Sequence, residues 1–367
     1  MRALFVSRTR YTFPLAPGVA RKWEALEQEL ELRVLASAGD GSAADESGRF
    51  VLVRPVRPRR LDGLAFWVAL PWRTARVVRA FRPDAIVCQT PYEAAAALVA
   101  RRVAGSSARV VVDVHGDWRT ATRLYGSPAR RLIARGADAV AAAALRRVDA
   151  ARTVSPFTAR LVRELGLEPE AEFPAFMDLD PFLGPRVPLP ERPQALFVGV
   201  LEAYKNVDGL ARAWALAAPR VPEATLRLVG KGTRTEVAES LVREHGVRWD
   251  RELAPAEVAR ALDEARVLVL PSRSEGMGRV LVEAFCRGRG IVGTRAGSIP
   301  DLVEDGASGL LVAPDDPAAL ADALVRTLSD RRLAARLGTG AAAAAEPWLQ
   351  TAEEYAGRVR ALVEGRR

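Results

Sequence analysis

The chain has 367 residues, of which 49% are hydrophobic and 27% charged, so it is neither disordered nor fibrous, and its length favours two domains. No apolar run approaches the roughly 18 to 20 residues that span a bilayer, and the N-terminus enters a strand-like segment without the layout of a signal peptide. We therefore expect a cytoplasmic protein, or one held peripherally at the inner face of the plasma membrane.

The formal net charge of +9 would ordinarily indicate nucleic acid or an anionic membrane as a partner. Only three of the 54 basic residues are lysines, and this excess of arginine is typical of a GC-rich coding sequence. We therefore expect no nucleic-acid partner. Two distant cysteines and two histidines are too few for a zinc knuckle, a disulfide framework or a histidine-rich metal site.

In the first half, short apolar runs alternate with helical stretches. Uninterrupted apolar runs are typical of parallel strands that are covered on both faces. We predict strands at residues 3–7, 32–36, 50–53, 85–89, 110–114 and 151–154, and helices at 19–31, 71–81, 92–103, 127–147 and 156–165. Strand and helix in alternation indicate βαβ units.

A proline-rich segment at residues 185–193 is too stiff for either element and is predicted to be an interdomain linker. A second alternating series follows it, and a closing helix at 347–364 is expected to cross back to the first domain. The predicted domains are thus 1–184 with 347–367, and 194–346. In the second domain we predict strands at 195–200, 225–230, 267–270, 290–293 and 309–312, and helices at 206–217, 235–244, 255–264, 279–287, 299–303 and 317–328.

In such sheets, ligands bind at the carboxyl ends of the strands, and the clearest candidate loop follows the strand at 267–270. Gly276 and Gly278 permit a close backbone approach, and the helix that opens at Arg279 presents unpaired N–H groups to an anion. Glu275 and Glu283 can border the same pocket, where carboxylates accept hydrogen bonds from paired hydroxyls. The alternative is that Glu275 is a charge at the helix N-terminus and Glu283 a surface residue.

Residues 271–284 resemble the E-x7-E signature of retaining GT-B glycosyltransferases of family 4. The resemblance continues through residues 293–303 and 305–312, and residues 197–206 and 228–232 resemble the first two donor-domain loops of that family. It implies an α/β protein of the GT-B fold, with two Rossmann-like doubly wound domains facing across a cleft. The second domain would hold a nucleotide sugar and the first an acceptor.

The resemblance also implies roles for individual residues. Lys205 would contact the donor diphosphate, Glu275 would hold the transferred sugar, and Glu283 would bind the ribose. Other donor-binding positions would be Gly199 in the first loop and the backbone of Gly276, Met277, Gly278, Arg279 and Val280.

One position departs from the family pattern. Val200 stands where the family commonly has an arginine after the first-loop glycine, so one phosphate-binding cation is missing. Arg279, Arg273 and Arg119 are the candidate substitutes. If none of them substitutes, we expect low donor affinity or turnover.

In the first half, the strand at 110–114 leads into His115, which resembles the family histidine near the reacting sugar. We expect it to hydrogen-bond a donor hydroxyl; a purely structural role is the alternative. Gly18, in a predicted loop at 15–19, is the counterpart of the family's glycine loop.

Asp178 and Asp180 form a D-x-D pattern that other glycosyltransferases use for manganese. Because the helix N-terminus at Arg279 already offers positive charge, we interpret this pair as a cap or turn and expect no metal and no other cofactor. Base recognition is assigned to a loop at 247–251.

Residues 64–73, with Arg76, Arg79 and Arg82 after them, mix aromatic residues with arginines. This pattern fits a helix lying on an anionic membrane, and it equally fits a core-facing helix with a solvated basic face.

The predicted function is transfer of a hexosyl group, with retention, from a UDP- or GDP-sugar to a hydroxyl of a carbohydrate, lipid-linked or small-molecule acceptor. Cell-envelope, exopolysaccharide and glycolipid biosynthesis are the expected settings. Two alternatives stay open: a nucleotide-sugar-binding scaffold subunit without turnover, and a sugar-nucleotide epimerase or hydrolase on the same fold.

Overall fold

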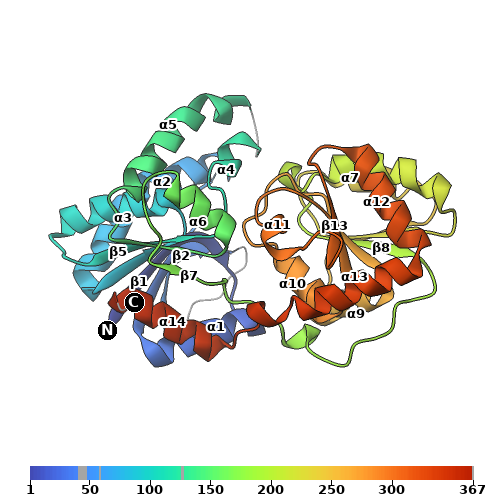
Figure 1. Ribbon diagram of the computed structural model, residues 1–367. Helices are drawn as coiled ribbons and strands as arrows, with labels where there is room; N and C mark the ends of the chain where they lie inside the picture. Colours follow the sequence, from blue (N-terminus) through green and yellow to red (C-terminus); the bar gives the residue numbers. More distant parts are fainter. Residues whose placement is uncertain (40–47, 58, 125–127, 366–367) are drawn as a thin grey trace. The chain divides into compact units, whose positions relative to one another are not determined.

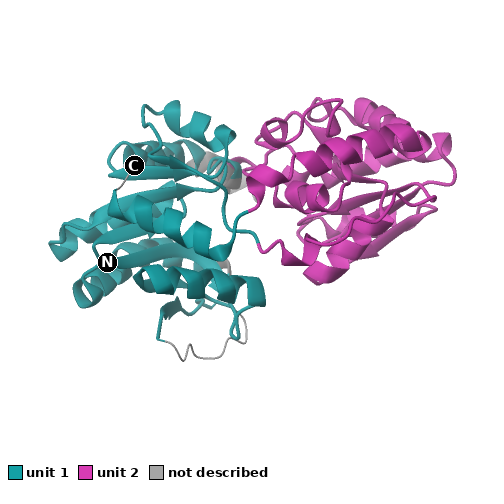
Figure 2. Ribbon diagram, turned by 60° about the horizontal axis from the view of Figure 1, so that its bottom comes forward, with its two compact units in different colours: residues 1–122, 128–177, 350–367 teal, residues 123–127, 178–349 magenta. Residues whose placement is uncertain are grey.

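The computed structural model describes residues 1–39, 48–57, 59–124 and 128–365, and the chain forms two compact units. Unit 1 comprises residues 1–122, 128–177 and 350–367, and unit 2 comprises residues 123–127 and 178–349 (Figure 2). Each unit is a parallel sheet covered by helices, as Figure 1 shows. The expected α/β class with two doubly wound domains is therefore confirmed.

The sheet of unit 1 has seven strands in the order β3-β2-β1-β4-β5-β6-β7, and every neighbouring pair is parallel. Central strands such as β4 are buried along their whole length, which explains their uninterrupted apolar sequence. The strands are β1 (Arg2–Tyr11), β2 (Glu31–Ala38), β3 (Phe50–Val53), β4 (Ala85–Cys88), β5 (Arg109–Val114), β6 (Ala150–Thr153) and β7 (Ala171–Glu172).

Helices cover both faces of this sheet. On one face α1 and α14 lie side by side (Figure 1), so the C-terminal helix does cross back to the first unit, as predicted. On the other face α2, α3 and α5 share a second core with the strands. The helices are α1 (Pro17–Glu29), α2 (Arg59–Phe81), α3 (Pro91–Ala104), α4 (Thr120–Arg123), α5 (Pro128–Leu145), α6 (Pro156–Arg163) and α14 (Ala352–Glu364).

The helix α2 begins twelve residues before the predicted start at residue 71, and Pro71 lies inside it. A proline inside a helix costs about 3 kcal/mol, which is why the sequence pattern favours a start there. The side chains of Phe66 and Leu70 lie one turn apart on the same side of α2, and their burial in the core offsets that cost.

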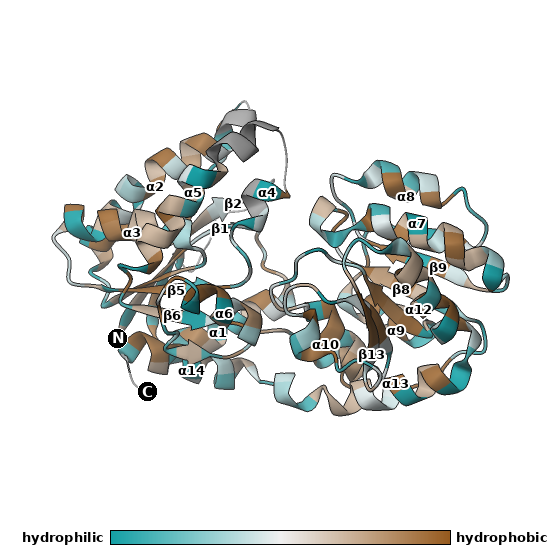
Figure 3. Cartoon of the chain, turned by 45° about the horizontal axis from the view of Figure 1, so that its top comes forward, coloured by the Kyte–Doolittle hydropathy of each residue, from teal (hydrophilic) through white to brown (hydrophobic). Residues whose placement is uncertain are grey.

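The sheet of unit 2 has six parallel strands in the order β10-β9-β8-β11-β12-β13. Hydrophobic residues, brown in Figure 3, gather on these strands, as β13 shows, and pack around the buried Trp214. The strands are β8 (Gln194–Val198), β9 (Thr225–Val229), β10 (Val247–Asp250), β11 (Val267–Leu270), β12 (Gly290–Thr294) and β13 (Gly309–Val312).

Seven helices and four short 3-10 turns complete the described part of unit 2. Five of the helices lie in the connections between strands, as βαβ units require, and two follow the last strand of the unit. The helices are α7 (Val207–Ala217), α8 (Thr235–Leu241), α9 (Pro255–Glu264), α10 (Arg279–Cys286), α11 (Ile299–Leu302), α12 (Pro317–Ser329) and α13 (Arg331–Ala343), and the turns are η1 (Asp180–Phe182), η2 (Ala203–Lys205), η3 (Ala218–Arg220) and η4 (Glu346–Trp348).

The proline-rich segment differs from the expected linker, because residues 178–193 all belong to unit 2. Buried arginines hold its carbonyl groups: Arg289 donates to the oxygen of Val187 at 3.1 Å, and Arg287 donates to that of Pro185 at 3.1 Å. Because proline has no backbone N–H group, a proline-rich segment cannot form the regular hydrogen bonds of a sheet or helix. Guanidinium groups donate to its carbonyl groups instead. The boundary therefore lies at residue 178, and not at the predicted residue 184.

Candidate functional site

The strongest candidate site lies at the carboxyl ends of β8 and β11 in unit 2. The ammonium nitrogen of Lys205 lies 2.5 Å from Oε2 of Glu275, and the two side chains are only 10% and 12% exposed. The hydroxyl of Ser272 donates to the same carboxylate oxygen at 3.3 Å. Two residues 70 positions apart in sequence are thus held together in a nearly water-free place, where a charge pair is strong.

The Glu275 backbone is fixed by the loop after β12. The amide of Ser298 donates to the carbonyl oxygen of Glu275 at 2.9 Å. Gly297 has a φ of +58°, and a Cβ atom there would lie 2.2 Å from that same oxygen. Only glycine satisfies both the left-handed conformation and the close approach. The Glu275 carboxylate is therefore positioned by an element that lies beyond its own loop.

Lys205 ends the turn η2, and the next residue is the N-cap of α7. Asn206 adopts a left-handed conformation with a φ of +55°, and its side chain accepts a hydrogen bond from the amide of Gly209 at 3.1 Å. This cap sets the direction in which the chain leaves Lys205. At Gly199 an added Cβ atom would contact the Lys205 side chain at 3.6 Å, so the first loop passes directly beside the lysine stem.

The helix α10 starts at the same place. Gly278 is its N-cap residue, with a φ of +61° and no side-chain cap, so α10 presents its first N–H groups without a capping side chain. Met277 and Val280 are buried and anchor this turn, and Arg279 is exposed. A helix N-terminus with these features attracts anions such as phosphate.

Glu283 lies on α10, half-buried, near both basic residues of the site. Burial raises the pKa of its carboxyl, and the charges of Arg279 and Lys205 oppose that rise. The structure thus brings together Lys205, Glu275, Gly278, Arg279 and Glu283, as the predicted donor site requires.

Val200, the departure from the family pattern, is 46% exposed. Of the three candidate substitutes, Arg273 is engaged with Asp315 at 2.7 Å and with the carbonyl of Ala203 at 2.6 Å. Arg119 belongs to unit 1 and donates to Asp117 at 2.8 Å. Within the described residues Arg279 makes no hydrogen bond or ion pair, so it is the substitute that the structure favours.

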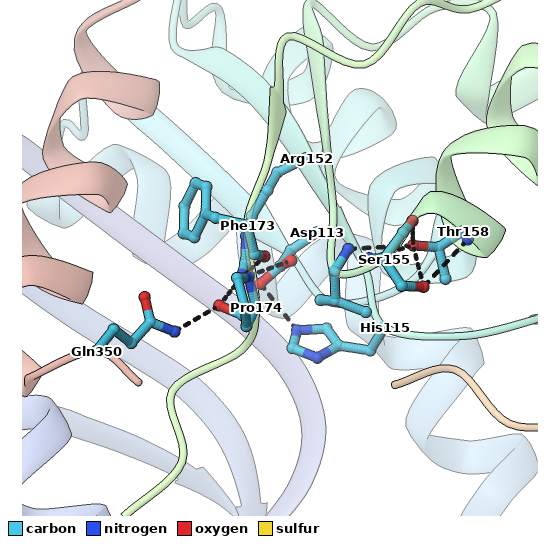
Figure 4. A network of polar contacts seen from close by, with 9 residues as sticks. Asp113, His115, Arg152, Ser155, Thr158, Phe173, Pro174 and Gln350 are labelled. Atoms are coloured by element: carbon cyan, nitrogen blue, oxygen red, sulfur yellow. Dashed lines mark hydrogen bonds and ion pairs between the residues drawn. The ribbon is translucent and has the colours of Figure 1, made fainter. Parts of the chain in front are cut away.

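In unit 1, His115 belongs to a polar network at the carboxyl end of β5 (Figure 4). Its ring Nε2 lies 2.8 Å from Oδ2 of Asp113, and Oδ1 of Asp113 accepts a hydrogen bond from Arg152 at 2.6 Å. Arg152 also donates to the carbonyl groups of Phe173 and Pro174, at 2.8 and 2.6 Å. The imidazole is 37% exposed, so its outer edge is accessible while Asp113 fixes its orientation.

Asp113 is held ionised. Burial by itself would raise the pKa of this carboxyl, but the charges of Arg152 and His115 lower it below its usual range. Asp113 and Arg152 were not among the predicted site residues. The spacing of Asp113 and His115 was a usable signal, because residues two apart in a strand lie on the same face. Arg152 lies 39 residues from Asp113 and carries no local signal.

Gly18, Asp180 and residues 247–250 lie in elements that differ from a free binding loop. Gly18 lies in the first turn of α1 and not in a loop, because Pro17 at the N1 position starts the helix earlier than predicted. Asp180 opens the turn η1, and no group of three or more potential metal ligands occurs among the described residues. Residues 247–250 form the edge strand β10, with Trp249 donating to the carbonyl of Gly230 at 2.8 Å, and not the predicted loop.

Two family models match the two halves of the chain. The "Glycosyl transferase 4-like domain" matches residues 15–173, and "Glycosyl transferases group 1" matches residues 192–330. The chain thus carries two domains of the glycosyltransferase type, one in each half. The second match contains the whole Lys205–Glu275 site, and the first contains His115 and its partners.

Two solved structures share the fold over essentially the whole chain. Sucrose-phosphate synthase from Thermosynechococcus elongatus has a TM-score of 0.76 at 17% identity, over 99% of this chain and 98% of that one. Anabaena HepE, in a complex with UDP and glucose, has a TM-score of 0.72 at 17% identity, with both chains fully covered.

Curated relatives match less than half of this chain. A D-inositol 3-phosphate glycosyltransferase of Corynebacterium urealyticum is 34% identical over 179 residues, which is 45% of this chain and 42% of the relative. One of the same name from Streptomyces scabiei is 35% identical over 164 residues, 41% of this chain and 37% of the relative. The chain thus spans less than half the length of these relatives. No described helix of this glycosyltransferase is long and apolar enough to cross a membrane.

Proposed function

We propose that this glycosyltransferase moves a hexosyl group from a UDP- or GDP-sugar to an acceptor hydroxyl, with retention at the anomeric carbon. The observation that carries the proposal is the buried Lys205–Glu275 pair beside the N-terminus of α10. A positive group, a carboxylate and a row of helix N–H groups are what a nucleotide diphosphate sugar needs at one place. Solved neighbours of the fold support the donor class, since Anabaena HepE carries UDP-glucose.

In this proposal the bound donor breaks the Lys205–Glu275 ion pair, and each of the two side chains then contacts the donor instead. Lys205 turns from Glu275 to the diphosphate, where it stabilises the charge that develops on the leaving group together with the amides at residues 276–280. The released Glu275 carboxylate accepts hydrogen bonds from the sugar hydroxyls. Glu283, about one turn into α10, accepts the ribose hydroxyls. Arg279 supplies the cation that is missing at Val200.

Unit 1 is proposed to hold the acceptor, with His115 as a hydrogen-bonding group for the sugar. Asp113 fixes the imidazole, so the imidazole edge that faces away from Asp113 is presented in a set orientation. No metal takes part in the proposed reaction, because Lys205 and the α10 N-terminus supply the positive charge. Activity is therefore expected to survive EDTA; loss on chelation with recovery on manganese would contradict this assignment.

One observation favours a second candidate, a nucleotide-sugar-binding subunit without turnover. The exposed Val200 leaves the first loop without its usual cation. Donor binding without product, in the presence of carbohydrate and lipid-linked acceptors, would support this alternative.

The test compares Glu275→Gln with the wild type and with Glu223→Gln, a matched change at an exposed glutamate. If Glu275 holds the sugar, its variant loses turnover by about 100-fold or more, and affinity for the free nucleotide stays the same. Equal loss of turnover and of nucleotide affinity would remove Glu275 from the sugar subsite. The Glu223 variant is expected to match the wild type in both measurements.

A further inference from the structure

A cavity of about 610 Å³ lies in unit 1 between the β3 edge of the sheet and the C-terminal half of α2. Four arginines line it, namely Arg33, Arg54, Arg73 and Arg76, beside apolar side chains that include Val77. Among the described residues no aspartate or glutamate lines it. The lining thus combines concentrated positive charge with an apolar wall.

Among the residues that the structure describes, few groups compensate the charge of this cavity. Arg33 donates to the carbonyl of Gly48, but Arg54, Arg73 and Arg76 make no hydrogen bond or ion pair with any described residue. The acid of the first turn of α2, Asp62, is already engaged by Arg10 at 3.4 Å. Arginines of this kind are suited to a phosphate group.

An exposed apolar row on α2 leads into the cavity. Leu64, Val68 and Trp72 are 66%, 65% and 65% exposed, and they follow one another at four-residue spacing, so they lie along one side of the helix. Arg76 continues the row by one turn and lines the cavity. We call Leu64, Val68 and Trp72 the α2 row. Large apolar side chains kept in water along one helix side mark a contact surface.

We propose that this face of unit 1 docks on an anionic membrane, with a phospholipid phosphate in the arginine cavity and the α2 row against the acyl region. The occupant follows from charge and polarity together, because an anionic phospholipid carries a phosphate next to apolar chains, in the same order as Arg76 and the α2 row. A tryptophan between the apolar and the basic part fits the polar boundary of a bilayer. The site lies on the flank of the sheet and is distinct from both His115 and the donor site.

The test is co-sedimentation of the full chain with vesicles of phosphatidylcholine, with and without phosphatidylglycerol. The wild type is expected to bind only the vesicles that contain phosphatidylglycerol. Arg73→Ala/Arg76→Ala should reduce that affinity about 30-fold, since each arginine near an anionic surface contributes to binding. The control Arg332→Ala/Arg336→Ala, which removes the same charge from exposed positions of α13, should bind like the wild type.

A second pair of variants tests the apolar part. Val68→Ser/Trp72→Ser should lose vesicle binding, whereas Leu216→Ser, at a half-exposed position of α7, should keep it. These exposed positions leave folding intact, which the melting temperature checks. Binding that is equal for both vesicle types, or unchanged in the arginine variant, would overturn the proposal. Binding of soluble glycerol 3-phosphate by the wild type and not by the arginine variant, without vesicle binding, would assign the cavity to a free phosphate ester and overturn it as well.

Discussion

At the scale of single residues, the nearly buried charged side chains of both candidate sites are paired with a side chain of opposite charge. Lys205 and Glu275 are each nearly buried and neutralise each other, and the same holds for Arg152 and Asp113 in unit 1. A charge of this kind depends on its partner, because a buried ion without one is very unfavourable.

Removing one member of the Lys205–Glu275 pair is therefore expected to cost more than removing both. Lys205→Met should lower the free energy of unfolding by about 3 kcal/mol or more, because Glu275 is left buried and unpaired. Lys205→Met/Glu275→Leu should recover much of that loss. Chemical denaturation of the two single variants and the double variant measures the coupling. Losses that simply add would show that the two side chains do not stabilise each other.

Glu93 predicts a pH dependence of stability in unit 1. Burial raises the pKa of its carboxyl to about 7, although hydrogen bonds from Thr90 and from the amide of Arg8 oppose the rise. The native state then binds a proton that the unfolded chain, with a pKa near 4.5, releases earlier. The free energy of unfolding should fall as pH rises from about 4.5 to about 7 and then level off. Denaturation of Glu93→Gln across this range should lack that fall; an equal fall in the variant would assign the dependence to another group.

At the scale of elements, the strands were the most predictable part. Buried parallel strands such as β4 and β11 read as continuous apolar runs, and these runs were placed correctly to within a few residues. The edge strand β10 was missed, because its sequence carries charged residues that face solvent at the sheet edge. The start of α2 was misplaced because tertiary packing outweighs the local preference of Pro71.

The glycine loop after β12 gives a prediction at this scale. Gly297→Ala would place a methyl group against the carbonyl oxygen of Glu275, in a left-handed conformation that alanine disfavours. We expect a loss of stability of about 1 kcal/mol or more and a larger proportional loss of turnover, since Glu275 must shift. Gly306→Ala is the matched control, with a φ of +80° and open space around it. It should share the stability cost and keep turnover. Equal turnover in the two variants would contradict the role of this loop.

At the scale of the whole molecule, the chain forms one parallel sheet in each unit, and its C-terminal helix α14 packs on the sheet of unit 1. The helix α14 buries six residues, among them Tyr355, Val359 and Leu362, in the core of unit 1. This return was predictable from the apolar spacing of the C-terminal helix together with the family resemblance. The network of Asp113 and Arg152 was not, because its partners come from separate strands and carry no common motif.

Deleting residues 350–367 should therefore unfold unit 1 and spare unit 2. Each large apolar side chain of α14 contributes about 1.5 to 3 kcal/mol by burial, so their joint loss rivals the stability of a typical domain. Calorimetry of the full chain should show two transitions, and the deletion should abolish one. The remaining transition should still respond to nucleotide. Retention of both transitions would show that α14 is not part of the unit 1 core.

Lys205 is the residue through which unit 2 is proposed to bind a nucleotide sugar. The direct test is a metal-free calorimetric titration of the full chain with UDP, GDP and their common sugar conjugates, with Lys205→Met and Arg332→Met in parallel. Arg332 is an exposed cation on α13, outside the donor-domain loops, and serves as the control. We expect one nucleotide to bind the wild type and the Arg332 variant equally, and to bind the Lys205 variant at least about tenfold more weakly. No binding to the wild type, or the same affinity in all three proteins, would contradict the proposed donor site.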